Sequence, residues 1–292
     1  MPKNLPKNTK NKAHVMSVWQ LTKSSARIIW DNRVVFVGIA LIYSILILVL
    51  AKGFAGGQNV GDLKKAVSDS LSGNGKEIGA SVAVFVSMIG SAGSGTTDSS
   101  GAYQLLVTVN TSLAIIWALR QILANKPFIF KDVYYKSMYP LIPFFIILAV
   151  VSLQLIPILL GSVLYSLVSS YGIAVSAIES ILWTLIFISL AALSLYFVCS
   201  SLLAVYIVTL PDMTPKKALA TAKELVKGRR WLVVRKIISL PIVLFIISAI
   251  VMLPIILIAA PLAQLVFYLL TVLSLVAVHT YMYLLYRNLI DA

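Results

Sequence analysis

The chain has 292 residues, of which 60% are hydrophobic and only 12% are charged, and its mean hydropathy is +0.95. A typical soluble domain is about 45–50% apolar and about 25% charged. Too few charged side chains remain to cover a water-exposed surface, so lipid must cover much of this protein. The composition also excludes a disordered, collagen-like or disulfide-stapled chain, because the apolar content is high, the 15 glycines show no period and Cys199 is the single cysteine.

Six apolar segments are long enough to cross a bilayer, which requires about 20 residues in a helix. They occupy residues 34–51, 103–119, 138–168, 181–210, 237–260 and 262–286. The third and fourth segments exceed the required length, so we expect them to tilt or to project beyond the hydrocarbon. Residues 78–89 form a shorter run rich in glycine, alanine and serine, for which we expect a re-entrant or interfacial piece. The sequence therefore predicts an all-α, polytopic membrane protein.

The positive charges divide unequally between the two sides of this topology. Twenty of the 24 lysines and arginines lie in the N-terminal segment, in the loops after the second and fourth apolar segments, and at the C-terminus. Because loops rich in lysine and arginine stay in the cytoplasm, we expect a multi-pass protein of the cytoplasmic membrane with both termini cytoplasmic. Nucleic-acid binding is not expected, because the charge is split among short loops and no binding motif accompanies it.

A basic, aromatic-rich segment precedes each odd-numbered span. These segments are residues 1–33, residues 125–140 and residues 211–237. Apolar residues at helical spacing predict one apolar face in the first of them: Val15, Val18, Trp19, Thr22, Ala26, Ile29 and Trp30. The predicted organisation is a cytoplasmic N-terminal segment, residues 1–33, and a six-helix transmembrane domain, residues 34–288. In that domain three hairpins each follow a cytoplasmic interfacial helix.

The third of these segments contains the signals of a complete short helix. Thr214 is a suitable N-cap, Pro215 fits the first helical position, and Gly228 can end the helix. The residues expected on its packing face are Ala218, Leu219, Ala222, Leu225 and Val226.

The pattern of Ala218, Leu225, Lys227, Gly228 and Trp231 resembles a recurrent stretch in a broad group of bacterial six-span inner-membrane proteins. This group includes proteins of uncharacterised function and the membrane domain attached to some glycerophosphodiester phosphodiesterases. Elsewhere the similarity is one of architecture. The resemblance implies six helices and no established activity. A phosphodiesterase catalytic domain is not expected, because the segments outside the spans are short and contain no cluster of histidine and carboxylate side chains.

No motif indicates catalysis, a metal or a cofactor. The two histidines, His14 and His279, lie in different segments without spaced partner ligands, whereas metal sites need clustered ligands. The glycine-rich run at residues 90–95 lacks the lysine of a phosphate-binding loop. We therefore expect a protein that is not an enzyme and holds no cofactor or metal.

Polar residues inside the spans are candidate functional positions, because such residues are costly in lipid. The candidates are Asn110, Gln154, His279 and Tyr283. They either form hydrogen bonds between helices, worth on the order of 0.6–2 kcal/mol each, or line a path for a solute or a proton. Prolines in the third and fifth spans allow the broken helices that transporters use, although kinks also serve ordinary packing. A small-solute permease is therefore the alternative function.

The segment before the fifth span carries the candidate lipid-headgroup residues. They are Lys227, Arg229, Arg230, Trp231, Arg235 and Lys236. A tryptophan ring suits headgroup depth, and guanidinium groups bind phosphate through two parallel hydrogen bonds. Two interpretations are open: charge anchoring without lipid preference, or a phosphate-headgroup site between this segment and the aromatic residues 128–139. The predicted function is an integral membrane protein without evident catalysis that interacts with anionic lipid headgroups or with partner membrane proteins.

Overall fold

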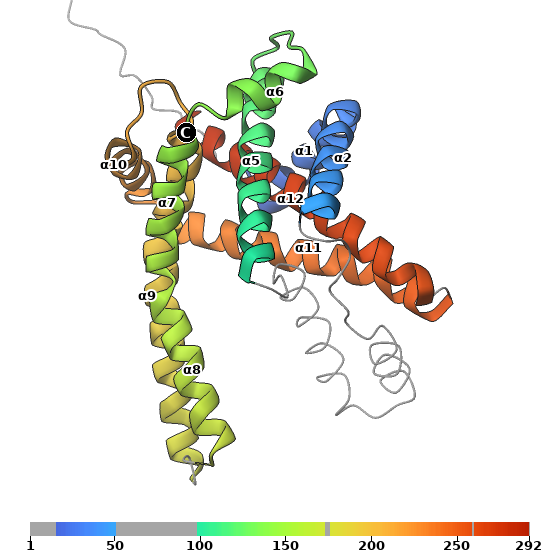
Figure 1. The fold of residues 1–292 in the computed structure, drawn as a ribbon. Helices are drawn as coiled ribbons and strands as arrows, with labels where there is room; N and C mark the ends of the chain where they lie inside the picture. The colour runs from blue at the N-terminus through green and yellow to red at the C-terminus, as the bar shows by residue number, and fades with distance from the viewer. Residues whose placement is uncertain (1–15, 51–97, 173–175, 259, 292) are drawn as a thin grey trace, which may run out of the picture.

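The computed structural model describes residues 16–50, 98–172, 176–258 and 260–291 (Figure 1). Within these residues the chain is helical and contains no strand. The helices, in chain order, are α1 (Val18–Asp31), α2 (Arg33–Leu50), α5 (Asp98–Leu123), α6 (Phe130–Ser137), α7 (Leu141–Gln154), α8 (Ile156–Ser170), α9 (Ala177–Ile207), α10 (Pro215–Val226), α11 (Arg230–Ile258) and α12 (Ala260–Asp291). The expected all-α fold is confirmed for this part of the chain. The piece expected at residues 78–89 lies outside the described residues.

Several helices have the length and composition of membrane spans. The candidates are Gly101–Leu123, Leu141–Ser170, Ala177–Ile207, Arg230–Ile256 and Leu265–Asp291. A sixth is reached if α1 and α2, which are bent by 84° at their junction, together form one span. The prediction of a multi-span helical membrane protein is confirmed at this level. The fifth apolar helix begins at Arg230 rather than at residue 237, because no glycine or proline separates the basic residues from the apolar run.

Local sequence signals set the ends of the short helices. The hydroxyl of Thr214 caps α10 by accepting a backbone N–H bond at 3.4 Å, and Pro215 is the first helical residue. Gly228 has a φ of +79°, in the left-handed region that favours glycine, and it separates α10 from α11. These three predictions are confirmed. Helix α1 begins in a capping box formed by Ser17.

The packed face of α10 is the predicted one, whereas the packed face of α1 overlaps the predicted face only in part, through residues such as Ile29. The fully buried residues of α10 are Ala218, Ala222 and Val226. In α1 the buried residues are Leu21 and Ser25. The serine fits there because its hydroxyl donates a hydrogen bond to the carbonyl of Leu21, 2.8 Å away in the same helix. Trp19 and Trp30, on the face expected from spacing, remain 75% and 70% exposed.

The long helices pack in pairs, and the short helices join these pairs together. Helix α2 lies against α5, α7 and α8 lie against α9, and α11 lies against α12. Of the short helices, α1 packs mainly on α12, α6 on α5 and α10 on α9. The largest hydrophobic core draws on α5, α7, α9, α10 and α12. The first described helix, α1, therefore packs against the last one, α12.

The pairs are not parallel to one another. In Figure 1, α7, α8 and α9 run down the view while α11 runs across it, so the α11–α12 pair is strongly inclined to the α8–α9 pair. Contacts of α12 with both α2 and α5 hold this inclination, through a small cluster that includes Tyr43, Val107 and Val272. The arrangement differs from a bundle of near-parallel hairpins. How the pairs cross a membrane remains a prediction.

Helix α9 changes its surroundings along its length. Large apolar side chains in its first two thirds are exposed: Ile178, Ile181, Leu182, Leu185 and Ile188. From residue 198 to residue 208 most side chains are buried, where α10 packs on the helix and the main core begins. Figure 1 shows that α8 and the first part of α9 extend past the other helices as a hairpin.

Candidate functional site

The basic segment, residues 227–236, comprises the end of the α10–α11 connection and the first turns of α11. Its side chains have different environments. Lys227, Arg229 and Arg235 are exposed, and Trp231 keeps 80% of its surface exposed. The segment therefore presents three cations and one indole ring on the protein surface.

Arg230 and Lys236 instead contact the rest of the protein. The guanidinium carbon of Arg230 lies 4.3 Å from the centroid of the Tyr196 ring on α9, a cation–π distance. Lys236 is only 2% exposed, and its ammonium donates a hydrogen bond to the carbonyl of Met16. The N–H of Met16 donates to Asn288 Oδ1 at 3.0 Å. Lys236 thus holds the start of α1 against α11 and α12.

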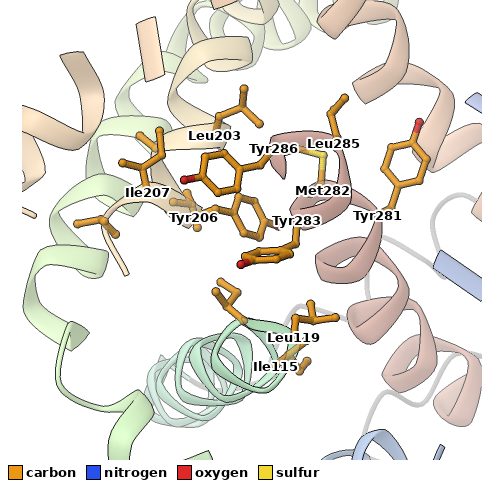
Figure 2. Packing of buried hydrophobic residues seen from close by; sticks show 14 of the residues in the cluster. Ile115, Leu119, Leu203, Tyr206, Ile207, Tyr281, Met282, Tyr283, Leu285 and Tyr286 are labelled. Atoms are coloured by element: carbon orange, nitrogen blue, oxygen red, sulfur yellow. The ribbon is translucent and has the colours of Figure 1, made fainter. Parts of the chain in front are cut away.

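His279 lies in a buried aromatic cluster between α9 and α12. Its Nδ1 is 3.1 Å from the hydroxyl oxygen of Tyr206 on α9, with the ring centroids 6.0 Å apart. Tyr283, one turn after His279, packs against Tyr206 and Tyr286 with centroids at 6.2 and 5.9 Å. In Figure 2 these three tyrosine rings gather opposite apolar side chains of α5. The structure thus brings two sequence candidates, His279 and Tyr283, together in a contact that joins three helices.

Gln154 does not belong to this cluster. It ends α7, and its backbone carbonyl accepts a hydrogen bond from Ser194 on α9 at 2.7 Å. Ser194 and Tyr206 are separated by about 18 Å along α9, at 1.5 Å per residue. Asn110 lies on α5. The side-chain oxygens of Gln154 and Asn110 are buried and have no hydrogen-bond partner among the described residues.

A cavity that no sequence pattern indicated lies where α5, the α6–α7 turn and the α9–α10 connection meet. Its volume is about 740 Å³, within the range of about 300–1,000 Å³ for small-ligand pockets. Helix α5 contributes Leu113, Trp117 and Arg120, whose spacings of four and three residues place them on one helix face. Lys136 at the end of α6 and residues 208–214 form other walls.

The expected phosphate-headgroup site between the basic segment and the aromatic residues 128–139 stays a prediction, and the cavity does not include the basic segment. Lys136, Ser137, Tyr139 and Pro140 line the cavity, but residues 227–236 are not among the described residues that do so. Helix α10, about 18 Å long at 1.5 Å per residue, carries the chain away from the cavity before the basic segment begins.

Helix α6 is fixed beside the cavity by its contact with α2. The Tyr134 hydroxyl donates a hydrogen bond to the carbonyl of Ile39 at 3.3 Å. Burial raises the pKa of Tyr134 to about 12, so the phenol stays protonated as the donor. The ring of Phe130 covers Gly38 so closely that a Cβ there would lie 2.8 Å from it. The absence of a side chain at Gly38 therefore lets α6 approach α2.

In the part of the chain that the structure describes, no three His, Cys, Asp or Glu side chains are grouped to hold a metal ion. Comparison of the chain with protein-family models, with curated proteins and with solved structures finds no match. The resemblance carried by Ala218 to Trp231 therefore remains a prediction, and function has to be argued from the chain's own residues.

Proposed function

We propose that the chain is a non-catalytic, multi-pass protein of the cytoplasmic membrane whose exposed basic segment binds anionic lipid headgroups. Both termini are cytoplasmic in this proposal, in keeping with the side on which twenty of the 24 lysines and arginines gather. Six spans form three hairpins, and α1, α6 and α10 lie on the cytoplasmic side. The local resemblance to bacterial six-span inner-membrane proteins agrees with this topology.

The first part of α9 is long enough to cross a bilayer. From Ala177 to Tyr196 the helix extends about 29 Å at 1.5 Å per residue, and its large apolar side chains there are exposed. The hydrocarbon core of a bilayer is about 30 Å thick. Lipid can therefore cover this part of α9. The lipid-exposed stretch ends at the level of Tyr196, beyond which other helices cover most of the side chains of α9.

The observation that carries the proposal is the position of Arg230 and Trp231 at that level. Arg230 stacks on Tyr196 itself, and the exposed indole of Trp231 follows directly. Indole rings favour the interface between lipid and water. Arg235 lies at most about 7.5 Å further along α11, which is within one Debye length of about 8 Å at physiological salt. Each cation near an anionic surface contributes about 1 kcal/mol, so Arg229 and Arg235 together contribute about 2 kcal/mol.

A comparison of two charge-matched variants tests the proposal. Arg229→Gln/Arg235→Gln removes two cations from the basic segment and leaves Arg230 on its ring and Lys236 in its buried bond. Lys216→Gln/Lys217→Gln removes two exposed cations from the first turn of α10, about 15 Å along that helix from Val226. Each protein is extracted with its lipid shell in polymer nanodiscs, and the retained lipids are quantified by mass spectrometry.

We expect the wild type and the Lys216→Gln/Lys217→Gln variant to retain a shell enriched in anionic lipid relative to the bulk membrane. The lipids retained by the Arg229→Gln/Arg235→Gln variant should approach the composition of the bulk membrane. Equal enrichment in all three proteins, with unchanged topology, would leave the basic segment with a charge-anchoring role only.

The permease alternative has less support from the geometry. A transport path requires its polar residues to line one route, but Gln154 contacts α9 at Ser194, about 18 Å along that helix from the Tyr206–His279 contact. The Nδ1 atom of His279 is already engaged by Tyr206. Interhelical bonding accounts for both His279 and Tyr283 without a solute.

A further inference from the structure

The cavity between α5, α6 and the α9–α10 connection contains a cation that its neighbours do not neutralise. Arg120 is partly buried, and its Nη2 donates a hydrogen bond to the hydroxyl of Thr209 at 2.5 Å. Its Nε is buried without an acceptor, and no described carboxylate lies within 4.0 Å of its guanidinium. An unpaired charge in a partly buried position is unfavourable. Because the Arg120 side chain lines the cavity and is partly exposed, an anion in the cavity can approach its charge.

The other charged side chains limit the charge of a ligand. Lys136 lines the cavity but already pairs with Asp132 at 2.9 Å. Asp212 also lines the cavity and is exposed, so its carboxylate opposes additional negative charge. The balance at Arg120 suits one compact anionic group, such as a single phosphate, and disfavours a polyphosphate.

The donors reach the cavity from different walls. Arg120 comes from α5. Lys136 has ammonium hydrogens beyond the one it gives to Asp132. The Thr214 hydroxyl accepts a backbone N–H and keeps its own hydrogen to donate. A tetrahedral phosphate can accept hydrogen bonds from several directions at once.

The wall on α5 also carries apolar side chains. Leu113 lies about 10 Å along α5 from Arg120, at 1.5 Å per residue, and Trp117 lies between them. The Trp117 ring is fixed by an edge-to-face contact with Phe128 at a centroid distance of 5.7 Å. A ligand that fills the cavity therefore combines an anionic end at Arg120 with an apolar or aromatic body against Leu113 and Trp117.

The position of the cavity leaves two sources for such a phosphate. Its wall on α5 includes Leu113 and Trp117, which belong to the predicted span at residues 103–119. The α9–α10 connection, which forms another wall, lies on the cytoplasmic side in the proposed topology. The cavity therefore lies at the cytoplasmic border of the membrane, where a soluble phosphate ester and a lipid headgroup are both within reach. This position rests on the proposed function, whereas the cavity and its donors do not.

We propose that this cavity binds a small phosphate ester with an apolar or aromatic group, and that Arg120 is its anion-binding residue. Phenyl phosphate is a suitable probe. It is titrated by calorimetry into the full-length protein in phosphatidylcholine nanodiscs, at an ionic strength that screens surface charge. One saturable site is expected. Arg120→Gln should weaken its affinity at least about tenfold, through loss of charge-assisted hydrogen bonds.

Two further variants separate ligand binding from an effect on the fold. Leu210→Trp places a larger side chain at a residue that lines the cavity without changing any charge, and it should also weaken binding at least about tenfold. Lys131→Gln removes an exposed cation of α6 that is not among the described residues lining the cavity, and it should bind within about threefold of the wild type. The proposal is overturned if phenyl phosphate shows no saturable binding, or if Arg120→Gln and Leu210→Trp both bind as the wild type does.

A second titration, in phosphatidylglycerol nanodiscs, identifies the source of the phosphate. A soluble ligand keeps its affinity there. A loss of about tenfold or more would mean that a lipid headgroup competes for the cavity and is the source of the phosphate. Arg229→Gln/Arg235→Gln should leave phenyl phosphate binding unchanged, so this proposal and the headgroup proposal can fail separately.

Discussion

Replacing Tyr206 by phenylalanine removes one hydroxyl from the buried contact between α9 and α12 and leaves the ring in place. That hydroxyl lies 3.1 Å from Nδ1 of His279, and the two residues are 4% and 9% exposed. Hydrogen bonds between membrane helices contribute about 0.6 kcal/mol on average and up to about 1.7 kcal/mol. A buried polar atom left without its partner costs about 1–3 kcal/mol. We therefore expect Tyr206→Phe to lower the free energy of unfolding by about 1–2 kcal/mol.

Tyr283→Phe is the matched control, because it makes the same chemical change in the same cluster. The Tyr283 hydroxyl forms no hydrogen bond with the described residues, and its ring contacts with Tyr206 and Tyr286 survive the substitution. This variant should stay within about 0.5 kcal/mol of the wild type. Unfolding is followed by circular dichroism and tryptophan fluorescence as sodium dodecyl sulfate replaces a mild detergent in the micelles.

The double variant Tyr206→Phe/His279→Phe completes the test, since it removes both partners of the bond. Its loss of stability should be smaller than the sum of the two single losses. Equal stability of Tyr206→Phe and Tyr283→Phe would refute the reasoning, because the hydrogen bond would then contribute nothing measurable. His279→Asn should also fold. Loss of a demonstrated transport activity in that folded variant would instead favour the permease alternative.

Three further predictions concern other contacts and the topology. Gly161→Leu should destabilise the α8–α9 hairpin by about 1–3 kcal/mol through overpacking, because a Cβ at this position would lie 3.2 Å from a leucine side chain of α9. Gly101→Leu is the control in the same unfolding assay, because a Cβ at Gly101 would have nothing within 4 Å. Lys236→Met should release the start of α1, which would be seen as faster amide hydrogen exchange in α1 with unchanged exchange in α9. Equal exchange of α1 in the wild type and the variant would contradict the proposed role of the Lys236–Met16 hydrogen bond. In a cysteine-free background, an impermeant maleimide should label a cysteine at Ser169 but not one at Thr221 on intact cells, and the opposite pattern would reverse the topology.

Features of the fold with a local cause could be predicted from the sequence. Thr214, Pro215 and Gly228 act through their own backbone neighbours, so the bounds of α10 follow from three residues. The packed face of α1 could not be predicted in the same way. Apolar residues occur on more than one side of this helix, and the partner that selects the side, α12, lies more than 200 residues away in the chain.

The candidate sites, too, depend on residues that are distant in the sequence, and these contacts could not be predicted. Arg120 near the end of an apolar helix is indistinguishable in sequence from an ordinary topology signal. Its meaning depends on Thr209, which the fold brings beside it from another helix. Lys236 is one of several neighbouring cations, and only its burial against Met16 separates it from the exposed ones. His279 could be selected as a polar residue in a span, but its partner, Tyr206, could not be identified from spacing.

The overlong apolar segment at residues 181–210 has two environments along α9. Its first two thirds present exposed apolar side chains, whereas the side chains after Phe197 are covered by α10 and by the main core. The Arg230–Tyr196 contact lies where the exposed part ends, and Thr209 lies about 20 Å further along the chain. That separation exceeds two Debye lengths of about 8 Å, so removing charge at one position hardly changes the potential at the other. The two binding proposals therefore concern separate sites, one with its cations at the start of α11 and the other with its cation on α5, and each charge variant should affect only its own ligand.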